Sequence, residues 1–357
     1  MTTTETLTIN RILNTIADRG ATDAHFVIGN YPYLRIKDQL LPISEEELIN
    51  PQFMESVINF FLSEDKKQLL KEKKELKFIY DWLNKARFRI HIFQQKGYFS
   101  VSLKLIPSKF KTLLELGLPK IIENFIKQTR GLLLIGGPFN SGRSTTVAAI
   151  IQTINQTRTE HILYLEEPIE QLFINNKSII EQREVGVDLL SFTEGLNSVK
   201  EEDVDIVVIS KIDSAESMEL LLELAQSGRL VIAIVNYDSV ISVLNGLVNE
   251  FSEEKSMWVR NVLAESLVGI VIQLLVPKIT GGRALALEIL TPTPSVKALI
   301  KEGRFSQLES IIQTSRAEGM VHLDKSLAEL VQKGEVAADE AIKYVRNPAA
   351  FKTIITK

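Results

Sequence analysis

Four short, almost wholly apolar segments set the strongest limit on the fold of this 357-residue chain. They cover residues 132–136, 162–165, 206–209 and 230–235. Strands that are apolar on both faces need cover on both faces, which is typical of a parallel sheet with helices on each side. Residues 214–227, closed by Gly228, have the length and the stop signal of one connecting helix. This part of the chain is therefore predicted to be α/β.

The first 107 residues follow a different pattern, in which polar and apolar side chains alternate. In residues 86–95, Arg87 and Arg89 share one face of a predicted strand whose other face is apolar and buried. Exposure to solvent alone explains such a polar face. Ser44, with Glu47 three residues later, predicts a capped helix start.

A turn-rich stretch at residues 106–110 separates the two patterns. We predict an N-terminal domain at residues 1–107, a linker at 108–112 and a second domain at 113–357. From residue 294 onward, the chain is expected to be a set of helices punctuated by glycines.

Composition excludes several classes of function. There is no cysteine, so disulfides, thiol nucleophiles and thiolate metal sites are excluded, and the four histidines are too far apart in sequence for a helical zinc pair. A net charge of -4 without long basic runs argues against nucleic-acid binding. The longest apolar stretch, residues 267–276, is interrupted by Gln273 and is about half the ~20 residues of a membrane span. We expect a cytoplasmic protein without a signal peptide or direct membrane insertion.

The motif that carries chemistry directly follows the segment at 131–136 and leads into an apolar helix. It has the spacing G-x-x-x-x-G-K-[ST], with arginine at the lysine position. Such a loop wraps backbone amides around phosphates at a helix N-terminus. Ser144 takes the position whose hydroxyl binds Mg²⁺ held by the nucleotide, and Asn140 tolerates a positive φ where glycine is common. The predicted nucleotide-binding residues of this loop are Gly137, Pro138, Asn140, Ser141, Gly142, Arg143, Ser144 and Thr145.

The cofactors expected at this loop are ATP and Mg²⁺. The alternative is a glycine turn without a ligand, but the context of strand, loop and helix favours a phosphate site. Arg143 is the main departure, because a long planar guanidinium needs a different geometry from a compact lysine ammonium.

Further motifs make the chain resemble the secretion ATPase superfamily, and most closely the PilT-like twitching-motility ATPases that power retraction of type IV pili. The resemblance covers almost the whole sequence. The matching segments are Thr22-Asp23-Ala24-His25 with S-D-L-H, Ala86-Arg87-Phe88-Arg89-Ile90 with A-R-F-R-V, Leu165-Glu166-Glu167-Pro168-Ile169-Glu170 with I-E-D-P-I-E, Gln182 to Gly186, Ile312 to Thr314, and Gly319-Met320.

The resemblance implies an N-terminal PAS-like α+β domain, then a RecA-like P-loop domain with a helical C-terminal part. It also implies a hexameric ring with nucleotide sites between the two kinds of domain, where arginines such as Arg87 and Arg89 approach the nucleotide. Lys104 stands where the family usually has another arginine. The implied partners are further copies or an active paralogue in a mixed hexamer, and the pilus platform protein of the inner membrane.

The sequence departs from the family at site positions. The family's G-E-M-R, whose glutamate orients the attacking water, is here Ser210-Lys211-Ile212-Asp213, and a family histidine is here Asn236. Losing a positioned base typically removes ~10²–10⁴ of rate acceleration, so ATP hydrolysis is expected to be strongly reduced or absent. Glu166 and Glu167 are candidates to polarise water through Mg²⁺. The alternative, that they only form an acidic turn at the end of a strand, explains their presence equally well.

Three functions stay open at this point. The first is a catalytically degenerate ring subunit with a regulatory or structural role, peripheral to the inner membrane through protein contacts. The second is an active hexameric motor that drives pilus retraction through a rearranged site. The third is a scaffold that binds no nucleotide.

Overall fold

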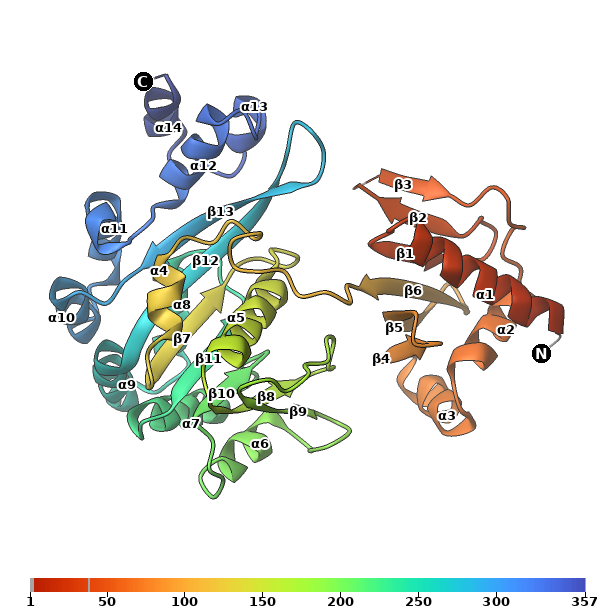
Figure 1. The fold of residues 1–357 in the computed structure, drawn as a ribbon, viewed down its shortest axis with the longest axis horizontal. Helices are drawn as coiled ribbons and strands as arrows, with labels where there is room; N and C mark the ends of the chain where they lie inside the picture. Colours follow the sequence, from red (N-terminus) through yellow and green to blue (C-terminus); the bar gives the residue numbers. More distant parts are fainter. Residues whose placement is uncertain (1–2, 38, 357) are drawn as a thin grey trace. The chain divides into compact units, whose positions relative to one another are not determined.

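The computed structural model describes residues 3–37 and 39–356, and the chain divides into two compact units, Met1–Lys109 and Phe110–Lys357 (Figure 1). The first unit is an antiparallel sheet with the strand order β3-β2-β1-β6-β5-β4. The strands are β1 (Asp23–Phe26), β2 (Tyr33–Ile36), β3 (Gln39–Pro42), β4 (Glu75–Trp82), β5 (Ala86–Gln95) and β6 (Tyr98–Ile106), and the helices are α1 (Thr3–Asp18), α2 (Pro51–Phe61) and α3 (Glu64–Lys73).

The alternation in β5 produces one buried and one polar face, as its sequence predicted. Phe88, Ile90 and Ile92 are fully buried in a core shared with α1 and α2. Arg87 and Arg89 alternate with them along the strand. The strand therefore presents both arginines on the face away from that core.

The predicted helix cap at Ser44 is wrong. The helix α2 begins at Pro51, and the side chain of Asn50 caps it by accepting a hydrogen bond of 2.8 Å from the amide of Phe53. Proline at the first helical position fixes φ near the helical value, so Asn50-Pro51 is the stronger start signal. Glu46 is instead buried in an ion pair of 2.6 Å with Arg11.

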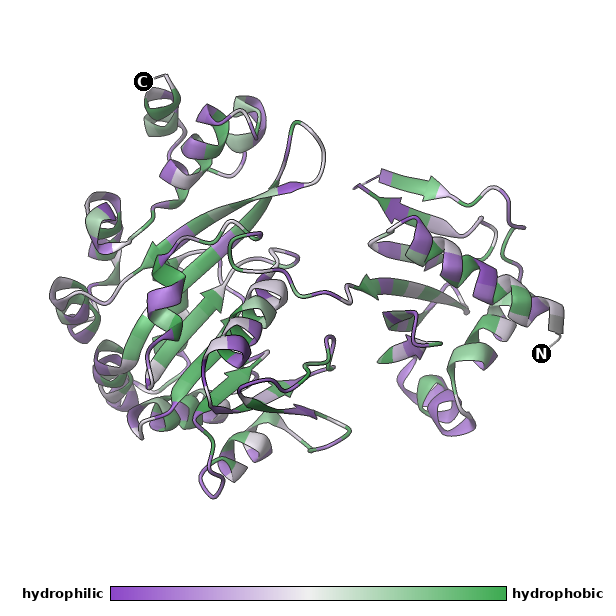
Figure 2. Ribbon diagram, in the orientation of Figure 1, coloured by the Kyte–Doolittle hydropathy of each residue, from purple (hydrophilic) through white to green (hydrophobic). Residues whose placement is uncertain are grey.

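The second unit contains the predicted α/β sheet, in the strand order β13-β12-β7-β11-β10-β8-β9. All neighbouring strands are parallel except the pair β12–β13. Figure 2 shows these strands as a hydrophobic centre. The strands are β7 (Gly131–Gly136), β8 (His161–Glu166), β9 (Ile179–Glu184), β10 (Ile206–Ile209), β11 (Leu230–Val235), β12 (Leu267–Pro277) and β13 (Arg283–Leu290).

Helices cover both faces of this sheet, because alternate residues of its strands point to opposite sides. In β7, Leu132 and Leu134 belong to one core cluster, and Leu133 and Ile135 to another. The first cluster is shared with α6 (Phe192–Ser198), α7 (Ala215–Gln226), α8 (Val240–Asn249) and α9 (Glu253–Ser266), and the second with α4 (Ile121–Ile126) and α5 (Arg143–Thr157).

The C-terminal part is helical, as predicted. Its α-helices are α10 (Pro294–Glu302), α11 (Leu308–Thr314), α12 (Leu323–Gln332), α13 (Ala338–Ala341) and α14 (Pro348–Ile355). An ion pair of 2.5 Å between Arg346 and the buried Glu288 ties this part to β13.

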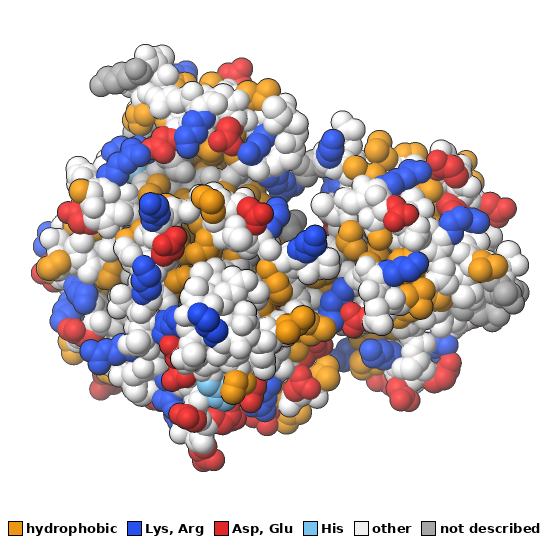
Figure 3. All heavy atoms as spheres, in the orientation of Figure 1, with side chains coloured by type: hydrophobic (Ala, Val, Ile, Leu, Met, Phe, Trp, Pro, Cys, Tyr) orange, Lys and Arg blue, Asp and Glu red, His pale blue; other side chains and the backbone are white. Residues whose placement is uncertain are grey.

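On the face drawn in Figure 3, basic and acidic side chains are interspersed with hydrophobic ones. Within residues 3–37 and 39–356, no helix has both the length and the apolar character needed to cross a bilayer.

Candidate functional site

The predicted phosphate loop runs from Gly137 to Gly142, between β7 and α5. Gly142 caps α5 with a φ of 87°, and Asn140 has a φ of 63°, the left-handed conformation expected of it. A Cβ on Gly137 would lie 2.3 Å from the carbonyl oxygen of Gln273 and 2.4 Å from the Oγ of Ser141. Only glycine fits there, so the close approach of the loop backbone to Gln273 and Ser141 depends on Gly137.

The start of α5 suits an anion. The amides of Arg143, Ser144 and Thr145 open the helix, where amides have no intrahelical acceptor and the helix dipole is positive. The side chains of Ser144 and Thr145 are in exposed residues. The Oγ of Ser141 is buried and has no hydrogen-bond partner among the described residues. These groups fit a phosphate-bearing ligand, and the exposed Ser144 hydroxyl is the candidate to hold its Mg²⁺.

Gln273 on β12 supports the loop, and sequence reasoning gave it no functional role. Its side chain is 1% exposed, and its Nε2 donates a hydrogen bond of 2.7 Å to the carbonyl oxygen of Ser141. Its Oε1 is also buried without a partner among the described residues. The sequence does carry a signal for this role, because Gln273 is a single amide side chain inside an otherwise apolar strand. A buried polar group of this kind needs a hydrogen-bond partner.

Arg143 points from the loop to the adjacent strand β11. Its Nη1 donates a hydrogen bond of 2.7 Å to the carbonyl oxygen of Val235 and another to the Oδ1 of Asn236. Burial lowers the pKa of this guanidinium. Two of the departures predicted from sequence, at positions 143 and 236, therefore contact each other.

Lys211 and Asp213, the charged residues after β10 that depart from the G-E-M-R motif, also have partners. The Nζ of Lys211 lies 3.6 Å from the Oε2 of Glu167, and both side chains are about half exposed. Asp213 accepts a hydrogen bond of 2.7 Å from the Oγ of Ser217, in the first turn of α7. Neither charge is left in an unfavourable environment.

Glu166, at the end of β8, differs sharply from its neighbour Glu167. It is 5% exposed and accepts a hydrogen bond of 2.9 Å from the Nε2 of Gln182. Burial raises its pKa to about 8, so this carboxyl is mostly protonated at neutral pH. Strands β11 and β10 separate β8 from β7, which places the β8 and β7 axes roughly 14 Å apart at ~4.8 Å per strand.

Arg87 and Arg89 lie on β5, in the first unit, whereas the phosphate loop lies in the second. The Nη1 of Arg87 makes an ion pair of 3.0 Å with Asp81. Arg89 is paired in register with Lys104 of β6. The structure thus brings the loop residues together in the second unit. The basic residues Arg89 and Lys104 form a separate pair on β5 and β6 of the first unit.

The parallel sheet, the glycine loop and the open amides of α5 define a RecA-like P-loop domain. A family described as Type II/IV secretion system protein matches residues 6–344. The chain is 34% identical to the type IV pilus retractation ATPase PilT of Pseudomonas aeruginosa, over 96% of this chain and 99% of that protein. It therefore belongs to the type II/IV secretion system protein family, and the resemblance to PilT-like ATPases is confirmed.

Solved structures support the same assignment. The crystal structure of the pilus retraction motor PilT with bound ADP matches with a TM-score of 0.87 at 31% identity, covering 96% of this chain and 98% of that one. The ATPase DotB of Legionella pneumophila shares the fold, with a TM-score of 0.83 at 20% identity, over 98% of this chain and 95% of that one. The chain is also 28% identical to the type IV pilus ATPase PilU of Pseudomonas aeruginosa, over 97% of this chain and 90% of that protein.

Proposed function

We propose that this protein is a nucleotide-binding ring subunit of a type IV pilus or related secretion machine that hydrolyses ATP slowly or not at all. The observation that carries the proposal is Lys211, which stands at the water-orienting glutamate position and is paired with Glu167. A protonated ammonium cannot take a proton from water at neutral pH. Of the two acidic candidates, Glu167 is held by Lys211, and Glu166 is buried with a raised pKa and is a poor base at the same pH.

Binding of ATP with Mg²⁺ is supported by the loop itself. Its phosphate contacts come from backbone amides, which the changes at positions 140 and 143 do not remove. The proposed nucleotide-binding residues are Gly137, Pro138, Asn140, Ser141, Gly142, Arg143, Ser144 and Thr145, with Ser144 as the Mg²⁺ ligand.

Arg143 is the loop residue whose role changes most. Since its guanidinium donates hydrogen bonds to Val235 and Asn236, its positive charge lies near the end of β11 and not at the lysine position between phosphates. We propose that this weakens binding of ATP and stabilisation of the transition state. Arg87 and Arg89 are proposed to bind phosphate or acidic groups, which paired guanidinium groups suit.

The proposed assembly is a hexamer, made of this chain alone or mixed with an active paralogue. The mixed hexamer is supported by similarity of this chain to two ATPases of one organism, PilT and PilU. The proposed location is cytoplasmic, against the inner membrane through a platform protein of the pilus. Mass photometry of the chain, alone and with such a paralogue, tests this: rings support it, and monomers in both samples contradict it.

The test of the function is binding and turnover of Mg-ATP by the purified protein. We expect binding at millimolar ATP with little turnover, and a gain of turnover in the double variant Arg143→Lys with Lys211→Glu. The variant Arg143→Lys with Lys211→Gln is the matched control, because it removes the ammonium without adding a carboxylate. Absence of binding at millimolar ATP would leave only a scaffold.

The alternative function is an active hexameric motor that drives pilus retraction. The intact loop, with Gly137, Asn140 and Gly142 in the conformations that a phosphate site needs, favours it. Wild-type turnover comparable with that of an active motor establishes this alternative and excludes the degenerate subunit.

A further inference from the structure

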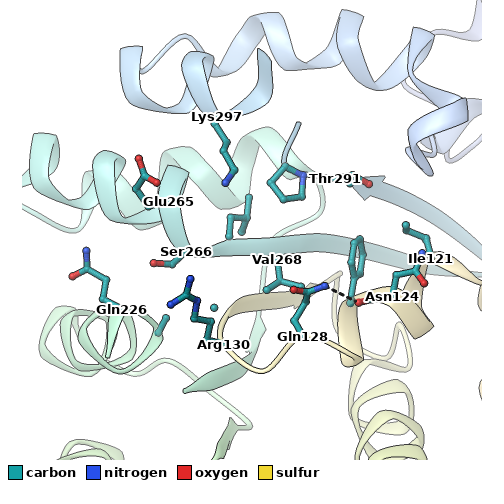
Figure 4. A pocket seen from close by; sticks show the side chains of 15 residues that line it. Ile121, Asn124, Gln128, Arg130, Gln226, Glu265, Ser266, Val268, Thr291 and Lys297 are labelled. Atoms are coloured by element: carbon teal, nitrogen blue, oxygen red, sulfur yellow. Dashed lines mark hydrogen bonds between the residues drawn. The ribbon is translucent and has the colours of Figure 1, made fainter. Parts of the chain in front are cut away.

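A cavity of about 620 Å³ opens at the amino-terminal edge of β7 and β12, away from the phosphate loop (Figure 4). Gly131 begins β7, Leu267 begins β12, and both line the cavity. The phosphate loop leaves the other end of the six-residue strand β7, roughly 20 Å away at ~3.3 Å per residue. The cavity is therefore separate from the nucleotide site proposed above.

Its floor carries apolar side chains. Phe125, Leu267 and Val268 are buried and line it. Gly131 and Ala225 add two positions without bulky side chains. The volume is in the range of ~300–1,000 Å³ that small-molecule sites occupy. Such a floor suits a planar apolar group.

Two cations reach toward this cavity from opposite walls. Figure 4 shows Lys297 extending from α10 and Arg130 from the segment before β7. Neither forms an ion pair with a carboxylate in the described part of the chain. Glu265, the acid of the lining, makes an ion pair of 2.5 Å with Lys301. That hydrogen bond lowers the pKa of Glu265, and nearby Lys297 lowers it slightly further. The cavity thus keeps a positive character on a chain whose net charge is -4.

Polar side chains complete the wall. Asn124, Gln128 and Gln226 bring amide groups to it, and Figure 4 shows the hydrogen bond of 3.3 Å from the Nε2 of Gln128 to the carbonyl oxygen of Asn124. The Oγ1 of Thr291 is buried at the wall without a partner among the described residues. Amide and hydroxyl donors beside two cations favour an oxyanion.

We propose that this cavity binds a small anionic ligand, an oxyanion carried on a planar apolar ring. Arg130 and Lys297 hold the oxyanion, and the ring lies over Phe125. The oxyanion is a phosphate or a carboxylate, and both place negative oxygen atoms between the two cations.

The test is titration of the full chain by isothermal calorimetry with phenyl phosphate and, separately, benzoate. The tighter of the two identifies the oxyanion. Inorganic phosphate lacks the ring and phenol lacks the charge, so both should bind more weakly. We expect Arg130→Gln and Lys297→Gln each to weaken the tighter probe by about tenfold or more, as loss of a charged hydrogen bond does.

A matched control lies three positions before Arg130. Lys127→Gln also removes one positive charge, but Lys127 does not line the cavity, and we expect its effect on affinity to stay below about twofold. Thermal unfolding of each variant confirms that it is folded. The proposal is overturned if neither probe binds at about 10 mM. It is equally overturned if the double variant Arg130→Gln with Lys297→Gln binds as tightly as wild type, because the probe then lies elsewhere, for instance at the phosphate loop.

Discussion

Two regions at one edge of the second sheet differ in how they hold their chemistry. At the end of β7, the phosphate loop depends on backbone conformation, and Gly137, Asn140 and Gly142 keep it. At the ends of β10 and β8, the proposed chemistry depends on side chains, and Lys211 lies there at the position proposed for a water-orienting carboxylate. The comparison teaches that a loop whose shape depends on backbone conformation keeps that shape while the charged side chains at neighbouring strand ends differ from those the resemblance implies.

The substituted side chains are accommodated in pairs. Arg143 bonds to Asn236, and Lys211 pairs with Glu167. An exposed pair such as Lys211–Glu167 contributes only ~0–1 kcal/mol to stability. In the proposed function its importance is therefore chemical, because it fixes a positive charge at the position proposed for the water-orienting glutamate.

The largest expected effect comes from exchanging that pair, in the double variant Lys211→Glu with Glu167→Lys. The exchange keeps the ion pair and restores a carboxylate at position 211. We expect ATP turnover to rise by ~10²-fold or more, the usual contribution of a positioned base. Steady-state phosphate release at saturating Mg-ATP measures it.

The single variant Glu167→Lys is the control, because it disrupts the pair without adding a carboxylate at position 211. Its turnover should stay at the wild-type level. If the exchanged variant also stays there, the two regions do not differ as argued, and Arg143 becomes the dominant defect.

The next effect is that of Gly137→Ala on nucleotide binding. The new Cβ would lie 2.3 Å from the carbonyl oxygen of Gln273, at a φ of +148°, so the loop must move. We expect ATP affinity to fall by ~10²-fold, because the backbone amides lose their common direction toward the phosphates. Fluorescence titration with a labelled ATP analogue measures it.

Gly281→Ala is the matched control for strain alone. Gly281 also has a positive φ, of +85°, but a Cβ there meets nothing within 4 Å. It should lower stability modestly and leave ATP affinity unchanged. Equal loss of affinity in both variants would show that general destabilisation, and not loop geometry, is being measured.

A smaller effect is expected for Gln273→Leu. The change leaves the carbonyl oxygen of Ser141 without its 2.7 Å donor, although it also removes the unpaired Oε1 of Gln273. We expect about a tenfold loss of ATP affinity, within the ~1–3 kcal/mol cost of an unsatisfied buried group. Calorimetric affinity and thermal unfolding should be measured together, since a purely structural role would lower the unfolding temperature without changing the affinity of the folded protein.

Much of the fold could be predicted from the sequence, because local pattern and tertiary structure agree. The apolar segments became parallel strands, since runs such as 230–235 are buried on both faces. The two faces of β5 followed from strict alternation. Asn140 could be assigned a positive φ because its motif position demands one and its side chain tolerates it.

The partners of the site residues could not be predicted, because they lie far away in sequence. Arg143 contacts Asn236, 93 positions later, and Gln273 contacts Ser141 across 132 positions. No local pattern encodes such contacts, which depend on strand order. The false cap at Ser44 failed for a different reason, since two cap signals competed and Asn50-Pro51 prevailed.

The last effect, on stability and not on turnover or ATP affinity, concerns Glu166→Gln. The pKa of Glu166 is about 8 in the folded protein because of burial, against an ordinary value of 4.5. Between these values the unfolded chain loses a proton that the folded chain keeps, so this residue's contribution to stability is full below pH 4.5 and is lost as pH rises to 8. The loss is about 1.4 kcal/mol per unit. Glutamine carries no charge, so the variant should gain stability relative to wild type by this amount per unit from pH 5 to pH 8, and no more above it.

Urea unfolding of both proteins at several pH values measures this difference, and its outcome bears directly on the comparison. If the stability of Glu166→Gln relative to wild type rises with pH, Glu166 is neutral at pH 7. Glu167, held by Lys211, is then the remaining acid among the candidates. A flat difference means that Glu166 is ionised in the folded protein. In that case a carboxylate is available beside β10 after all, and the active motor becomes the better explanation of the intact phosphate loop.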